Sequence, residues 1–179
     1  MRSLSTSLSA PALRRVAPDT AAKDNVAEAQ KLLRALLGAL RGEASTTLQI
    51  SPDFKVQLFT VQGHLDASLS INEFRIASVE AKQSFPDFAF RGDALSALQG
   101  PESEDGEGMD AQLMWRGTHS GVPYSPSLGL GRGLPPVHSS GQRWLIRDSV
   151  ARVRMDKGVV TSLDVVGAGP MEWHAAALK

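Results

Sequence analysis

The chain has 179 residues, of which 42% are hydrophobic and 21% are charged, as expected for one folded domain with a substantial core. Lysine and arginine balance aspartate and glutamate, 19 against 19, so no net charge draws the chain to nucleic acid or to an anionic membrane. The absence of cysteine excludes disulfides, thiolate catalysis and cysteine zinc sites. No apolar run is long enough to span a membrane.

Residues 1–22 differ from the rest of the chain. They contain four serines and three arginines, and no acidic residue precedes Asp19. This composition is typical of an organelle transit peptide, and it also fits an ordinary disordered tail. The first reading implies a soluble plastid or mitochondrial protein and the second a cytoplasmic one. Both readings place the folded domain at residues 23–179.

Two helices are expected in the first half. Apolar residues recur at helical spacing from Val26 to Leu40, Asn25 suits a helix cap, and Gly42 suits a stop. SPDF (51–54) is typical of a turn. Ser70 with Glu73 predicts the start of a second helix, which Pro86 ends.

The remaining segments are typical of strands. Strands are expected at 56–62, from Phe88 onward, and at 111–119, 143–155 and 159–166, with a polar loop at 99–108 and helix formers after Pro170. Residues 120–141 are rich in glycine and proline and predict a long irregular loop, a mobile flap over a pocket mouth. Helices followed by antiparallel strands indicate an α+β fold, with helices on one face of a curved sheet and a pocket between them.

Candidate site residues come first from strand periodicity. In 143–155, alternation puts Asp148 on one side with Trp144, Ile146 and Val150. In 159–166, it puts Asp164 on one side with Val160, Ser162 and Val166. A carboxylate among apolar side chains suits a base in an apolar pocket, because desolvation favours its protonated form. The alternative is a structural ion pair with one of the arginines on strand 143–155.

Further candidates lie on the neighbouring segments. Trp115 and His119 point the same way on strand 111–119, where Trp115 is either core or a ligand wall. Tyr124 and His138 belong to the long loop and could cover the pocket. The histidines lack metal-binding spacing and GLGRG (129–133) lacks a phosphate-binding pattern, so neither metal nor cofactor is expected.

Several short motifs recur in a fixed order along residues 25–167. They are SPDF (51–54), FPDF (85–88), GTHSG (117–121), LPP (134–136), SGQRW (140–144), MDKGVV (155–160) and SLDVV (162–166). In this order they resemble the SnoaL-like family, the polyketide-cyclase-type members of the nuclear transport factor 2-like superfamily. The resemblance implies an α+β cone, in which N-terminal helices pack on a curved, mostly antiparallel sheet that encloses a pocket. This scaffold hosts many functions.

The resemblance also implies residue roles. The cyclases use an aspartate on the last strand as general acid/base without metal or cofactor, and its position here is Asp164. The position of their assisting histidine is Val150, and the GTHSG histidine is His119. We therefore expect Asp164 as base, with Asp148 as polar partner and His119 as orienting group.

Together with Trp115, Tyr124, His138, Trp144 and Val150, these residues would bind a small apolar or polycyclic molecule. The chain would then catalyse a cofactor-free cyclisation or isomerisation. The alternative is a non-catalytic ligand-binding or scaffold domain on the same fold. A homodimer through the outer sheet face is a further expectation.

Overall fold

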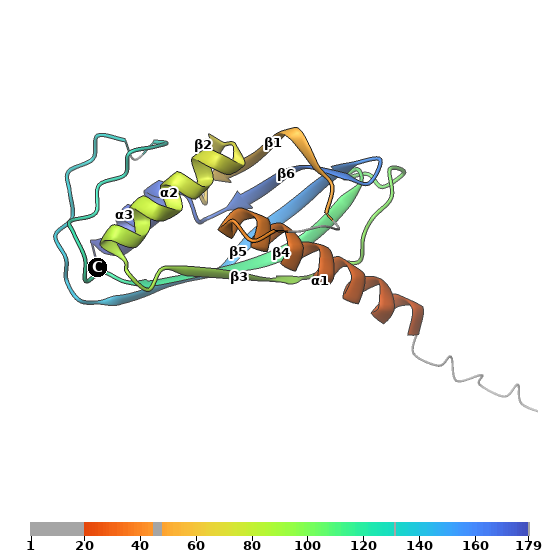
Figure 1. The fold of residues 1–179 in the computed structure, drawn as a ribbon, viewed down its shortest axis with the longest axis horizontal. Coiled ribbons are helices and arrows are strands. Elements are labelled where there is room, and N and C mark those ends of the chain that lie inside the picture. The colour runs from red at the N-terminus through yellow and green to blue at the C-terminus, as the bar shows by residue number, and fades with distance from the viewer. Residues whose placement is uncertain (1–19, 45–47, 131, 179) are drawn as a thin grey trace, which may run out of the picture.

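The structure is a computed structural model that describes residues 20–44, 48–130 and 132–178. For residues 20–24, 147 and 148 it describes the backbone alone. The helices and strands are, in chain order, α1 (Thr20–Arg41), β1 (Ile50–Phe59), β2 (Leu65–Leu69), α2 (Ile71–Ser84), β3 (Ala89–Ala94), β4 (Gly108–Thr118), β5 (Arg143–Asp156), β6 (Val159–Val166) and α3 (Pro170–Ala177). Figure 1 shows α1 and α2 crossing the sheet on one side, with α3 near α2 at one end. The expected α+β class is confirmed.

The six strands lie in the order β2-β1-β6-β5-β4-β3. All neighbouring pairs are antiparallel except β1 and β6, which run parallel. Two details of the sequence analysis are wrong here. SPDF (51–54) lies inside β1 and is not a turn, and β2 was not expected at all. No helix within the described ranges has the length and hydropathy to cross a membrane.

Helix α1 follows from its apolar stripe. Leu33, Leu36 and Leu40 are fully buried, and Gly42 ends the helix with a φ of +89°, a conformation that favours glycine. The start at Thr20 lies five residues before the expected cap at Asn25. The helix therefore crosses the expected boundary at 22/23, whereas residues 1–19 of the transit-like segment lie outside the described residues.

Helix α2 begins where the sequence predicts. The Ser70 hydroxyl accepts a hydrogen bond from the Glu73 N–H at 3.3 Å, and the Glu73 carboxylate accepts one from the Ser70 N–H at 2.7 Å. This reciprocal pair is a capping box. The buried Phe74 and Ala81 face the core, and Arg75 donates to the Ala39 carbonyl, which ties α2 to the end of α1.

Irregularities in β5 and β6 change which residues face the helices. The β4–β5 register shifts between Leu113 and Trp115, so a bulge in β5 lies between Ile146 and Ser149 and separates Trp144 from Val150. Val150 is 58% exposed, whereas Trp144 is buried, so the prediction that they share a side is wrong. A second shift, between Arg154 and Met155, likewise separates the buried Val160 from the remainder of β6.

The long loop 120–141 is tied to the core at several points. Tyr124 is buried and exchanges two backbone hydrogen bonds with Val137, each of 2.8 Å. The His119 carbonyl accepts a bond from the Gly141 N–H at 2.7 Å. The Pro135 carbonyl lies 2.9 Å from the His174 ring Nε2. These contacts contradict the expectation of a loosely held flap, and we now expect slow amide exchange at Tyr124.

Candidate functional site

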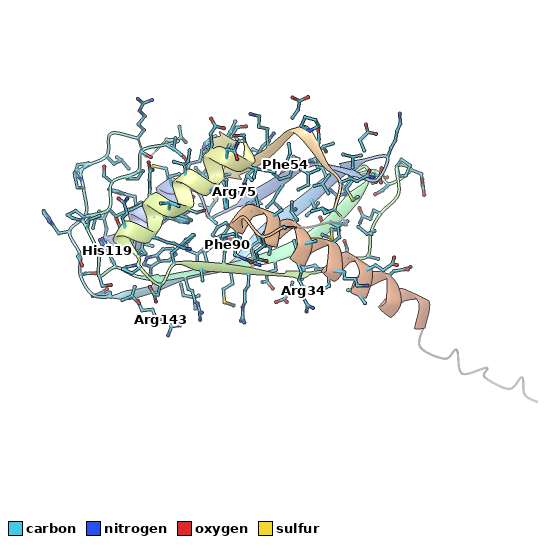
Figure 2. All side chains as sticks on the ribbon, viewed as in Figure 1. Arg34, Phe54, Arg75, Phe90, His119 and Arg143 are labelled. Atoms are coloured by element: carbon cyan, nitrogen blue, oxygen red, sulfur yellow. The ribbon has the colours of Figure 1, made fainter. Side chains whose placement is uncertain are left out.

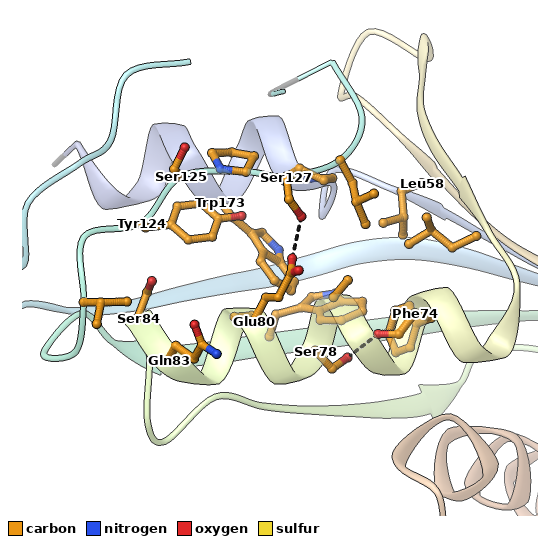
Figure 3. A pocket seen from close by; sticks show the side chains of 18 of the residues that line it. Leu58, Phe74, Ser78, Glu80, Gln83, Ser84, Tyr124, Ser125, Ser127 and Trp173 are labelled. Atoms are coloured by element: carbon orange, nitrogen blue, oxygen red, sulfur yellow. Dashed lines mark hydrogen bonds between the residues drawn. The ribbon is translucent and has the colours of Figure 1, made fainter. Parts of the chain in front are cut away.

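A cavity of about 230 Å³ lies between α2, α3 and the loop 122–128. We call it the α2–α3 cavity. Its apolar wall comes from the core side of the sheet and from the two helices, and includes Leu58, Leu69, Phe74, Trp115 and Trp173. Figure 3 shows the loop with Tyr124, Ser125 and Ser127 across this space from helix α2, with the Ser127 hydroxyl directed toward Glu80. The sheet, one helix on each side and the loop thus enclose a largely apolar chamber.

Two tryptophans form the deep wall of the α2–α3 cavity. Trp115 is 1% exposed and its ring lies 5.1 Å from Phe90 and 5.8 Å from Trp173, measured between centroids. Phe88 stacks on Trp115 at 6.3 Å, and this ring cluster fixes both indoles. Neither indole N–H has a hydrogen-bond acceptor among the described residues. A buried donor without an acceptor costs about 1–3 kcal/mol.

The polar groups of the cavity gather on the loop side. The Ser127 hydroxyl donates a hydrogen bond to the Glu80 carboxylate, which links the loop to α2 (Figure 3). Glu80 is the one acidic residue among the described residues that line the cavity. Burial raises the pKa of the Tyr124 hydroxyl far above its usual value, and the nearby Asp66 and Glu80 carboxylates add to the effect. Tyr124 therefore remains a neutral hydroxyl at any ordinary pH.

Asp66, on β2, links the segments that surround the α2–α3 cavity. Its side chain accepts a hydrogen bond from the Leu130 N–H at 2.7 Å and another from the Met171 N–H at 3.0 Å. Asp66 is 5% exposed, so these bonds satisfy a buried carboxylate. Gly129 and Gly169 pass so close that a Cβ on either would lie within 2.5 Å of an Asp66 oxygen. One carboxylate therefore connects the loop, β2 and the first turn of α3.

A second cavity, of about 520 Å³, lies between α3 and the start of β5. His119, Trp144 and Glu172 are among the residues that line it. Burial lowers the pKa of His119, so its neutral form is favoured near neutral pH. Burial raises the pKa of Glu172, although its carboxylate accepts bonds from the Val61 and Gly169 N–H groups. His119 and Trp144 thus belong to this second cavity and do not line the α2–α3 cavity with Trp115 and Tyr124.

Asp164 lies on the sheet face away from the helices. Its register partner on β5 is Arg152, whereas the buried Leu163 pairs with the buried Val153. The Asp164 carboxylate accepts a hydrogen bond from Arg154 Nε at 2.6 Å and another from the Ser162 hydroxyl at 2.9 Å. The expectation that Asp164 faces the pocket is therefore wrong, because the irregularity after Val160 places the two residues on opposite sides.

Two further predicted site residues, His138 and Val150, do not line the α2–α3 cavity. His138 and Val150 are exposed, and neither lines the second cavity. The side chain of Asp148 lies outside the described residues. Within the described ranges, no group of three histidine or acidic residues is placed to hold a metal ion.

Sequence reasoning missed Glu80, Asp66 and Trp173. Glu80 lies on a helix with a mixed face, so periodicity alone does not single it out. Asp66 lies on a strand of five residues that the sequence did not reveal. Trp173 follows Pro170 in a segment expected only to cap the structure. The available signal was the aromatic Trp173 near the start of this short helix, because a large aromatic residue there indicates packing against the rest of the domain.

The chain is similar to several solved structures. AclR, a candidate hydroxylase from Streptomyces galilaeus, is 19% identical over 79% of each chain, with a TM-score of 0.45. A candidate SnoaL-like polyketide cyclase from Jannaschia sp. CCS1 is 16% identical over 84% of this chain and 89% of that one, with a TM-score of 0.42. A candidate polyketide cyclase from Pseudomonas putida KT2440 is 16% identical over 83% and 96%, with a TM-score of 0.45.

One of these three proteins is named a SnoaL-like polyketide cyclase and another a polyketide cyclase. No protein-family model matches the chain, and no curated protein matches it. All three identities lie below 25% and all three TM-scores below 0.5, so we transfer no residue role, substrate or reaction from these proteins.

Proposed function

We propose that the chain binds a small, flat and largely apolar molecule in the α2–α3 cavity. The observation that carries the proposal is an apolar chamber walled by Trp115 and Trp173, whose indole N–H groups lack acceptors among the described residues. Apolar cavities with a few directed polar groups are the usual form of small-molecule sites. This proposal develops the ligand-binding alternative of the sequence analysis.

The volume of the cavity limits the ligand. An apolar cavity of about 150 Å³ is known to hold benzene. The α2–α3 cavity, of about 230 Å³, therefore suits a molecule of one or two fused rings, and a larger polycycle would need the loop to move. A flat shape is favoured, because the two indoles and Phe74 present rings to the chamber.

The polar groups suggest what the ligand carries. An acceptor such as a ketone oxygen would satisfy an indole N–H after a small shift of the ring, and would offset the cost of the unpaired donor. The neutral Tyr124 hydroxyl can donate or accept at the opposite side. An aromatic ketone combines these features, whereas a purely hydrocarbon ligand leaves both indole donors unpaired.

Proton transfer is the second candidate function, and Glu80 is the observation that favours it. The Glu80 carboxylate lines the cavity, whereas Asp164 lies on the other face of the sheet. A positioned carboxylate can remove an activated proton from a bound ketone without metal or cofactor. Ser127, which donates to Glu80, would hold its orientation.

Calorimetric titration with naphthalene and with 2-acetylnaphthalene tests binding. The two probes differ by one acetyl group, so their affinity ratio reports the polar contact. Trp173→Phe removes the indole N–H and keeps an aromatic ring, and it should weaken binding of the ketone about three- to tenfold while leaving naphthalene unchanged. Trp144→Phe is the matched control, because Trp144 does not line this cavity.

Absence of binding by both probes, or equal effects of the two tryptophan substitutions, would refute the binding proposal. Proton transfer is tested separately, by the exchange of the acetyl protons of the bound ketone with deuterium. Glu80→Gln should abolish enzyme-dependent exchange and keep binding. If the wild-type protein binds the ketone without accelerating exchange, the chain has the binding function alone.

A further inference from the structure

A groove of about 450 Å³ lies on the edge of the sheet formed by β3, β4 and β5. Three arginines, Arg91, Arg116 and Arg143, line it together with Met114 and Leu145. All three arginines are exposed. In Figure 2, Arg143 projects away from the helices, whereas Phe90 lies on the helix side of β3. The groove is thus separate from the α2–α3 cavity.

The strand register places the three arginines in a diagonal row. Arg116 pairs with Ala89 on β3 and with Leu145 on β5, so it lies between the other two. Arg91 pairs with Met114, two residues before Arg116, and Arg143 pairs with Thr118, two residues after it. Each step crosses one strand spacing and two residues along a strand, which gives about 8 Å between neighbouring Cα atoms.

Within the described residues, the charges of the arginine row are balanced only in part, by the Asp87 carboxylate near Arg143. None of the three guanidinium groups forms an ion pair there, and no acidic side chain lines the groove. The carboxylate of Asp87, near Arg143, accepts bonds from the Thr118 N–H and hydroxyl. Neighbouring like charges on one sheet face repel one another. An anionic partner would relieve this repulsion, and guanidinium groups are well suited to bind carboxylates in pairs of hydrogen bonds.

We propose that this groove binds an extended acidic segment of a partner protein. In an extended chain, residues i and i+2 project to one side about 7 Å apart, close to the step of the arginine row. Three alternate acidic residues could therefore each meet one arginine. A single phosphate is too small to span a row about 16 Å long. Met114 and Leu145 add apolar contact beside the charged row.

Other polyanions fit the groove less well. A single-stranded nucleic acid has a similar charge spacing, but its binding sites stack bases on exposed aromatic rings. Among the described residues that line the groove, Phe90 is the one aromatic residue, and it is buried on the helix side of β3. The chain's own acidic loop contains Glu102 and Glu104. Its backbone is folded into turns, with bonds from Ser103 N–H to the Gly100 carbonyl at 3.1 Å and from Gly106 N–H to the Ser103 carbonyl at 2.9 Å. This loop does not present an extended row of carboxylates.

Fluorescence anisotropy with a labelled peptide of alternating glutamate and valine, (Glu-Val)4, tests the proposal at low salt. The wild-type protein should bind it, and rising salt should weaken binding, because the contacts are between charges near the surface. Arg116→Gln removes the central charge and should weaken binding about tenfold or more. Arg132→Gln, in an exposed loop position outside the groove, is the matched control and should bind as the wild type does.

Thermal unfolding of both variants establishes that each is folded. No binding by the wild-type protein, or equal losses in the two variants, would overturn the proposal. If the wild-type protein binds an oligothymidylate more tightly than the peptide, and Arg116→Gln abolishes that binding, the groove is a nucleic-acid site instead. A third outcome is that the wild-type protein fails to bind the peptide and dimerises as its concentration rises. If Arg116→Gln abolishes that dimer, the groove binds a second copy of the chain.

Discussion

Replacement of Asp66 by alanine should release the loop and α3 together. The change removes the carboxylate that accepts from the Leu130 N–H at 2.7 Å and the Met171 N–H at 3.0 Å. Both N–H groups would lose a charged acceptor in a site where Asp66 itself is 5% exposed. Neither of these N–H groups has another acceptor among the described residues.

The expected size of the effect follows from these two bonds. A hydrogen bond to a charged group contributes about 1.5–3 kcal/mol, so we expect the loss of two such bonds in Asp66→Ala to lower the free energy of unfolding by about 3–6 kcal/mol. For a chain of this length, that corresponds to a fall of about 10 °C in the thermal midpoint. Loss of the buried Asp66 side chain itself adds a smaller packing cost.

Urea unfolding measures the change, and hydrogen exchange locates it. The Leu130 and Met171 amides should exchange much faster in the variant, whereas amides at the centre of β5 should not change beyond the global effect. Asp93→Ala is the control, because Asp93 is an exposed acid on β3. A loss below 1 kcal/mol for Asp66→Ala, or unchanged exchange at Leu130, would refute the argument that this carboxylate holds the loop.

Two further outcomes separate structural from catalytic roles of acidic residues. Asp164→Asn should cost only about 0.5–1 kcal/mol, because its partner Arg154 is half exposed to solvent, and it should leave binding in the α2–α3 cavity unchanged. If Asp164→Asn abolished binding in the α2–α3 cavity and left stability unchanged, Asp164 would have a role in ligand binding instead. For Glu172, the raised pKa means that the folded state holds its proton more tightly than the unfolded chain does. Its contribution to stability should therefore fall as pH rises past 4.5. Urea unfolding of Glu172→Gln across this range should show a flatter pH dependence than the wild type, and parallel curves would contradict the assignment.

Local patterns predicted most of the regular elements. The apolar stripe of α1, the Ser70 capping box and the polar loop before β4 each depend on a few neighbouring residues, and each is found in the structure. The short β2 is different. Its five residues include the buried Asp66, and aspartate has a low propensity for strands. The hydrogen bonds that satisfy Asp66 come from residues 64 and 105 positions away, so no local pattern reveals them.

The candidate site depended on long-range detail that a sequence pattern does not contain. Alternation along a strand identifies one face only while the strand is regular. The bulge in β5 and the irregularity in β6 each add residues, and so Val150 and Asp164 lie on the outer face of the sheet. Trp115 and Tyr124 both line the α2–α3 cavity.

The parallel pairing of β1 with β6 affects how the chain folds during its synthesis. The hairpin of β1 and β2 joins the rest of the sheet through β6 alone. About 100 residues lie between these partners, so at ordinary rates of translation β6 is synthesised about 5–20 s after β1. During that interval the edge of β1, with Val56 and Leu58, has no strand beside it. A chain stalled before residue 159 would expose this apolar edge to aggregation, and we expect such nascent chains to depend on chaperones.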